Sequence, residues 1–168
     1  MRAGRLRYSE NVMSEVRRIA SELHRAYEGP AWHGPALKEI LAGVGWEMAA
    51  ARPIAEAHSI WELVLHLTVW MNVVRRRLAG AEIPTLTSEQ DWPASPEASE
   101  AAWNAAIEGL AAAQRDLEAA VREMTDERLR EIVQGDVPYP IHVMLHGTVQ
   151  HNLYHGGQMA LLKKAARA

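Results

Sequence analysis

Residues 151–158, His-Asn-Leu-Tyr-His-Gly-Gly-Gln, place two histidines four residues apart in a segment with helical periodicity. Residues four apart lie above one another on one face of an α-helix, so both imidazoles can reach the same point in space. Steps of three and four along this segment select a row that we expect to face a bundle core: Ile141, Met144, Thr148, His151, His155, Gln158, Leu162 and Ala165. Burying the imidazoles in this row without partners costs about 1–3 kcal/mol per unsatisfied group. A bound metal ion would remove that cost.

Long helices with an apolar face are expected at four places, covering about residues 9–27, 59–80, 95–124 and 140–164. Ser59 and Glu62 form a capping-box pattern, and Ser95-Pro96 is a helix cap followed by proline at the first helical position. The connections are irregular, with a short helix at 37–41 and a short extended piece at 131–133. The predicted fold class is therefore all-α, a four-helix bundle with long irregular connections, in one domain covering residues 1–168.

Composition excludes several classes of function. The formal net charge of −3 gives no reason to expect nucleic acid or an anionic membrane as a partner. The longest apolar stretch, around 63–74, contains His66, Thr68 and Asn72 and is too short to span a bilayer, and the basic N-terminal tail is not followed by an apolar signal segment. Because the chain has no cysteine, any thiol chemistry needs a thiol from a cofactor or substrate. We expect a cytoplasmic protein.

His66 is a third candidate ligand, on the second predicted helix at the edge of its core-facing row. Alone, such a histidine is usually an ordinary core residue with a hydrogen-bond partner. His151 and His155, however, also lie on an inward face of the same bundle. Three histidines from two helices would form an open metal site, with one to three positions left for water or substrate.

The chain resembles the DinB-like superfamily in four blocks, which cover residues 29–35 (GPAWHGP), 59–66 (SIWELVLH), 91–93 (DWP) and 146–158 (HGTVQHNLYHGGQ). The resemblance implies a four-helix bundle, often homodimeric. It also implies one divalent metal ion per chain, commonly nickel or zinc, held by one histidine of the second helix and an H-x-x-x-H pair of the last. In this sequence those ligands are His66, His151 and His155, and all three are present.

Activity in the family that the chain resembles is diverse. Some members are S-transferases or isomerases that use bacillithiol, mycothiol or glutathione, others resemble hydrolases, and many have no assigned activity. Three neutral imidazoles leave the ion its full charge, which would lower the pKa of a bound thiol. We therefore expect a metal-dependent enzyme that transfers a low-molecular-weight thiol to a small electrophilic substrate. A hydrolase using metal-bound water and a non-catalytic metal-binding stress protein remain alternatives.

Two residues are weaker candidates for catalysis. Gln158, one turn after His155, would orient substrate or metal-bound water. Glu62, one turn before His66, would accept a hydrogen bond from that ligand or act as a general base, although its capping role already explains it. Gly156 and Gly157 each cost a helix about 1 kcal/mol relative to alanine, which indicates a close approach by backbone or ligand.

Other polar residues have simpler interpretations. Arg75-Arg76-Arg77 is most simply the solvated end of a helix, with a phosphate- or carboxylate-binding cluster as the alternative. Together with Trp32 and His33, these arginines are the only candidates for contacts with a thiol. His33 is most simply an ordinary loop histidine, with a place at the entrance of the site as the alternative. His142 and His146 lie away from the ligand face and are expected at the surface or an interface, with His146 bonded to nearby backbone.

Overall fold

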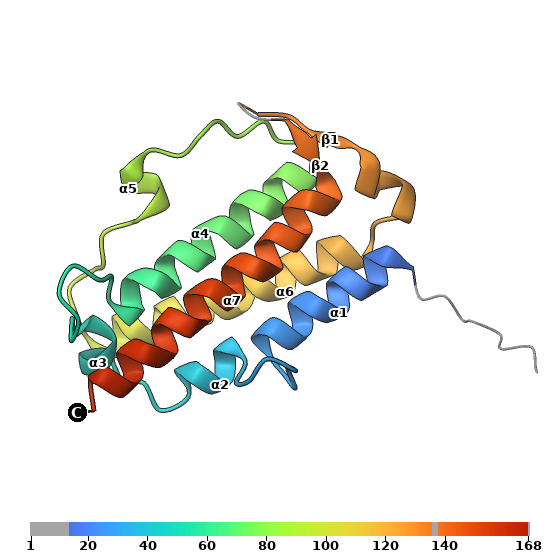
Figure 1. Ribbon diagram of the computed structural model, residues 1–168. Coiled ribbons are helices and arrows are strands. Elements are labelled where there is room, and N and C mark those ends of the chain that lie inside the picture. The colour runs from blue at the N-terminus through green and yellow to red at the C-terminus, as the bar shows by residue number, and fades with distance from the viewer. Residues whose placement is uncertain (1–13, 136–137, 168) are drawn as a thin grey trace, which may run out of the picture.

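The computed structural model describes residues 14–135 and 138–167. Its elements in chain order are α1 (Glu15–Tyr27), α2 (Leu37–Leu41), α3 (Trp46–Ala50), α4 (Ile60–Leu78), α5 (Ser88–Asp91), α6 (Glu100–Arg122), the 3-10 helix η1 (Asp126–Arg130), β1 (Ile132–Val133), β2 (Tyr139–Pro140) and α7 (Ile141–Ala165). The four long helices α1, α4, α6 and α7 lie alongside one another, as Figure 1 shows. The all-α bundle predicted from the sequence is therefore confirmed.

The four long helices form a closed ring of contacts. Helices α4 and α1 each pack against both α6 and α7, so the buried apolar side chains of all four helices form one cluster. In Figure 1, α5 lies in the long connection between α4 and α6, while α2 and α3 lie at the end of the bundle opposite the β1–β2 hairpin. Among the described helices, none has both the length and the apolarity that a membrane span would need.

Helix ends follow local capping chemistry. The capping box of Ser59 and Glu62 begins α4 as predicted, with a hydrogen bond in each direction between side chain and backbone. By contrast, α6 begins at Glu100 rather than at Pro96, because the Ser99 hydroxyl accepts the hydrogen bond from the Ala102 amide. The predicted start of the first helix near residue 9 lies outside the described residues, and α1 is described from Glu15 onward.

The connections contain more structure than the sequence analysis predicted. The short helix at Leu37–Leu41 is confirmed with the same bounds, and the extended piece forms β1, which pairs antiparallel with β2. The short helices α3, α5 and η1 were not predicted, since segments of four or five residues are too short for a periodic pattern. Pro140 then serves as the N-cap residue of α7.

Helix α7 is buried along two rows, of which the sequence analysis predicted only one. The predicted row includes His151 and His155 and contributes to the face toward α4. The second row consists of Leu145, Val149, Asn152, Gly156 and Met159. This second row is buried because α7 also packs against α1 and α2. The buried surface of this helix is therefore wider than the single predicted row, because one side packs against α4 and the other against α1 and α2.

Candidate metal centre

Three imidazole rings from two helices converge at the face that α7 turns toward α4. The Nε2 atom of His151 lies 3.0 Å from Nε2 of His66 and 3.1 Å from Nε2 of His155. One nitrogen from each ring lies within 4.8 Å of the others. His66 and His155 are buried, and His151 is half-buried. This geometry brings together the three residues that the sequence analysis selected.

The connection that contains α5 fixes the ring of His66. The backbone carbonyl of Asp91 lies 2.8 Å from His66 Nδ1, and the Asp91 carboxylate lies 3.2 Å from the same atom. Trp70 donates its indole N–H to that carboxylate at 2.6 Å, which holds the carboxylate in place. Because both groups of Asp91 are acceptors, Nδ1 of His66 is the protonated nitrogen and Nε2 has the free lone pair.

Gln158 fixes the ring of His155 in the same way. The side-chain oxygen of Gln158 lies 2.7 Å from His155 Nδ1, so this nitrogen donates and Nε2 has the lone pair. The Nε2 lone pairs of His66 and His155 therefore both point toward Nε2 of His151, which in a neutral ring has at most one N–H to donate. At least one lone pair then lacks a proton donor from this cluster, and a cation would satisfy it.

The spacing of these nitrogens fits a metal ion. Two nitrogen ligands at about 2.0–2.1 Å from one ion lie roughly 3.0–3.4 Å apart. The two Nε2–Nε2 distances, 3.0 and 3.1 Å, fall in this range. Hydrogen bonds from Nδ1 to an oxygen acceptor are also the usual support of metal-binding histidines. The donor set can therefore hold one metal ion.

Trp92 covers one side of the cluster. Its ring is stacked on His66, with ring centroids 3.9 Å apart and an angle of 5° between the planes. On its other face Trp92 stacks on His58, at 3.6 Å and 3°. The indole excludes water from the buried side of His66 and restricts the orientation of that ring.

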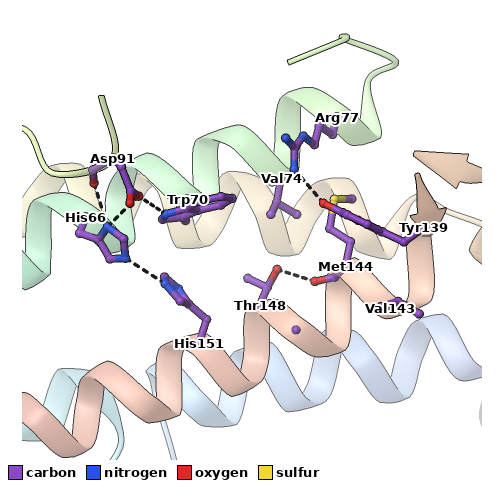
Figure 2. Close-up of a pocket in the computed structure, with 11 residues that line it drawn as sticks. His66, Trp70, Val74, Arg77, Asp91, Tyr139, Val143, Met144, Thr148 and His151 are labelled. Carbon is purple, nitrogen blue, oxygen red and sulfur yellow. Dashed lines mark hydrogen bonds and ion pairs between the residues drawn. The ribbon is translucent and has the colours of Figure 1, made fainter. Parts of the chain in front are cut away.

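An open cavity of about 440 Å³ lies beside the histidines. Figure 2 shows it between α4 and α7, with His66 and His151 at one end and Arg77 and Tyr139 at the other. The wall between these ends includes the apolar side chains of Val74 and Met144. A small molecule in this cavity would therefore lie beside His66 and His151 while contacting apolar side chains along its length.

Burial favours the neutral form of His151 and His155. Loss of solvent, together with the neighbouring His155 and His66, lowers the pKa of His151 to about 4, while Asp91 acts in the opposite direction. Burial also lowers the pKa of His155, against the hydrogen bond to Gln158, which raises it. Both rings therefore have a free lone pair at neutral pH, which is the form that binds metal ions.

Acid should destabilise the metal-free protein. The pKa of His151 in the folded state lies below its value of 6.5 in the unfolded chain, so between these values the unfolded state binds more protons. This contribution to stability is present above pH 6.5 and is lost as the pH falls toward 4. Allowing for the partial exposure of His151, we expect unfolding to cost about 1–2 kcal/mol less near pH 5 than near pH 7.5. Urea unfolding of chelator-treated protein measures this, and an equal pH dependence in His151→Ala would contradict it.

Glu62 does not act on His66. Its carboxylate accepts the Ser59 amide at 2.7 Å and forms an ion pair with Arg52, while the acceptor beside His66 is Asp91. Burial alone would raise the pKa of Glu62, but the hydrogen bonds from Ser59 and the charge of Arg52 lower it. The capping role is confirmed, and the contact with His66 is made by Asp91 instead of Glu62. A role of Glu62 as general base stays a prediction.

Gln158 contacts one of the three histidines. Its amide oxygen bonds Nδ1 of His155, the nitrogen on the side of the ring away from the cluster, so Gln158 orients that ring. Its predicted contact with substrate or metal-bound water stays a prediction. Of the two glycines before it, Gly156 approaches a neighbour closely, because a Cβ there would lie 3.3 Å from the Leu37 side chain. A Cβ on Gly157 would meet no atom of the structure within 4 Å, so close approach does not explain that glycine.

The remaining histidines lie outside the cluster. Nδ1 of His142 lies 3.1 Å from the Leu129 carbonyl, whereas His146 lies 3.5 Å from the carboxylates of Glu15 and Glu22. The predicted backbone contact of His146 is thus wrong and occurs at His142 instead, one helical turn earlier. His33 lines a separate cavity between α2 and α7, and Trp32 is fully exposed, so neither lines the cavity beside the histidines.

Asp91 and Trp92 are the residues of the centre that sequence reasoning missed. They entered the sequence analysis only as part of a turn that resembles the family. Their segment has no helical periodicity, and nothing in its composition indicates that it folds back over His66. The available signal was the combination of a carboxylate and an indole in a long polar connection, which is too common to assign to a site.

Comparisons with known proteins support the fold and identify the family. A structure described as a conserved protein from Enterococcus faecalis is similar over 92% of this chain and 98% of its own, with a TM-score of 0.69 and 19% sequence identity, which supports the fold alone. No curated protein matches the sequence significantly. The family model of the DinB superfamily matches residues 20–159, a span that contains all three histidines and most of the bundle. The chain therefore belongs to the DinB superfamily.

Proposed function

We propose that the protein is a metal-dependent enzyme that transfers or adds a low-molecular-weight thiol to a small electrophile. One observation supports this most directly: three imidazole nitrogens converge at one end of an open cavity of about 440 Å³. His66, His151 and His155 would hold one nickel or zinc ion through Nε2. Bound there, the ion would lower the pKa of a thiol in the cavity and so supply a thiolate at neutral pH.

The cavity lining favours a nucleophile that needs no protein base. Among the described lining residues, Asp91 is the only carboxylate. It accepts the Trp70 indole N–H and lies 3.2 Å from Nδ1 of His66. The Thr148 hydroxyl donates to the Met144 carbonyl. A thiol loses its proton far more readily than water, so it depends less on a base in the cavity. The protein side chains would position the two reactants and exclude water from them.

Electrophile consumption tests the proposal. We expect metal-loaded protein to consume a model electrophile, such as an aryl halide or an epoxide, only when a low-molecular-weight thiol is added. The rate should fall to the uncatalysed level in His151→Ala and remain unchanged in His142→Ala, a histidine of the same helix whose Nδ1 bonds the Leu129 carbonyl. Turnover that is independent of thiol would indicate a hydrolase. No turnover from protein with a filled metal site would indicate a non-catalytic metal-binding protein.

We also propose that the chain forms a homodimer. Support comes from the family, and from three exposed apolar side chains on α7, Val143, Tyr154 and Leu161, whose spacings of eleven and seven residues place them on one face of the helix. The cytoplasmic location stays a prediction from the sequence.

A further inference from the structure

The three consecutive arginines at the end of α4 have different surroundings. Arg76 is exposed, and Arg75 lines a separate cavity between α4 and α6. Only Arg77 lines the cavity beside the histidines. Residues 66, 70, 74 and 77 follow one another at helical steps of four, four and three, so Arg77 lies on the same face of α4 as His66. Figure 2 shows the two side chains at opposite ends of the cavity.

Within the described part of the chain, Arg77 donates its hydrogen bonds to neutral partners. One terminal nitrogen donates to the Tyr139 hydroxyl at 2.8 Å, and the other donates to the Ile83 carbonyl at 3.0 Å. Its Nε atom is buried and has no hydrogen-bond partner in the described chain. No carboxylate of the described residues forms an ion pair with this guanidinium. A partly buried arginine of this kind favours an anion in contact with it.

The space between the two ends is apolar. Val74 and Met144 are buried and Val143 is exposed, and all three line the cavity. At about 1.5 Å per residue, His66 and Arg77 are roughly 16 Å apart along the axis of α4. The carboxylate of Asp91 lies at the histidine end, where it is bonded to His66 and Trp70. The cavity thus combines a site for a metal-binding atom, an apolar middle and a cationic end.

We infer that Arg77 is a specificity-determining residue that binds the anionic group, most simply a carboxylate, of an elongated substrate or thiol co-substrate. This inference rests on the proposed function in placing the reactive atom of that molecule at the histidines. The guanidinium would bind the carboxylate with charge-assisted hydrogen bonds from the N–H groups of its terminal nitrogens that do not bond Tyr139 or Ile83. Tyr139 and Ile83 hold the arginine in place for this contact. The ligand class is therefore an anion with an apolar chain between its charge and its reactive end.

Paired probes that differ only at one end test this inference. The protein is loaded with cobalt, and thiol binding is measured from the thiolate-to-cobalt absorption band. Mercaptoalkanoates of several chain lengths are each compared with the mercaptoalkanol of the same length. We expect the best carboxylate probe to bind about ten- to a hundredfold more tightly than the matching alcohol. This preference should disappear in Arg77→Met and persist in Arg76→Met, which removes one charge from the same helix end without touching the cavity.

A second experiment tests the anion site independently of the proposed function. Octanoate and octanol contain no thiol, and their binding to chelator-treated protein is measured by ligand-observed NMR. A preference for octanoate that depends on Arg77 would support the anion site even if the histidines bound no metal. Equal binding of carboxylate and alcohol in both experiments, or a preference for the carboxylate that survives in folded Arg77→Met, would overturn the inference about Arg77. Should Arg77→Met fail to fold, Arg77→Lys is expected to weaken the preference several-fold, and an undiminished preference there would also overturn it.

Discussion

Replacement of His151 by alanine is expected to weaken nickel or zinc binding by more than about a hundredfold, since removal of a supporting residue alone typically costs ten- to a hundredfold. His151 is the central member of the cluster, with its Nε2 close to Nε2 of both His66 and His155. The two remaining histidines would leave the ion with solvent in place of its third protein ligand. Metal analysis after dialysis, followed by competition with a chromophoric chelator, measures the loss.

Thermal unfolding gives a second readout of the same variant. An ion that binds only the folded state stabilises it by about 2.7 kcal/mol at a hundred times its dissociation constant. Wild-type protein and His142→Ala should both gain this stability when metal is added, and His151→Ala should gain little at the same concentration. Full metal stoichiometry in His151→Ala or in His155→Ala at low ion concentration would show that the ligand assignment is wrong.

Replacement of Gln158 by leucine is expected to weaken metal binding by about ten- to a hundredfold, although Gln158 is not a proposed ligand. Its side-chain oxygen accepts the Nδ1 proton of His155 at 2.7 Å, so it determines that Nε2 has the free lone pair. Without this acceptor the ring can adopt the other tautomer or rotate. The affinity of the Gln158→Leu variant, measured by the same chelator competition, tests the expectation.

Two comparisons make the Gln158 experiment specific. Gln158→Glu keeps an acceptor at the same place and should restore most of the affinity. Gln150→Leu changes an exposed glutamine of the same helix and should have no effect. Asp91→Ala should weaken metal binding less than Gln158→Leu does, because the backbone carbonyl of residue 91, 2.8 Å from His66 Nδ1, remains as an acceptor. Wild-type affinity in Gln158→Leu would show that His155 needs no support from this residue.

The local parts of the fold could be predicted from the sequence because short-range patterns determine them. The capping box of Ser59 and Glu62, the helix at Leu37–Leu41 and the four long helices depend on residues three or four apart. The same spacing placed His151 and His155 on one face of a helix. Bundle packing then required their row to meet another inward-facing helix, which made His66 a reasonable third member.

Where the sequence permitted two local interactions for the same helix end or side chain, it did not show which one forms. Ser95-Pro96 and Ser99 both fit the start of a helix, and the structure uses Ser99. Glu62 fits both a cap and a partner of His66, and its carboxylate bonds the Ser59 amide. In each pair the local chemistry permits both outcomes, so the contacts made by the rest of the chain decide between them.

Only the tertiary structure determined the surroundings of the three histidines. The connection between α4 and α6 has no periodic pattern, yet its position brings Asp91 to Nδ1 of His66 and stacks Trp92 on the same ring. The packing of α7 against α4 also gives two neighbouring arginines different surroundings: Arg77 lines the cavity, whereas Arg76 is exposed. The sequence by itself determined the helices and the histidine row, because both follow from short-range geometry. The supporting acceptors, the indole cover and the cationic end of the cavity depend on contacts between residues far apart in the chain, and no local spacing specifies these.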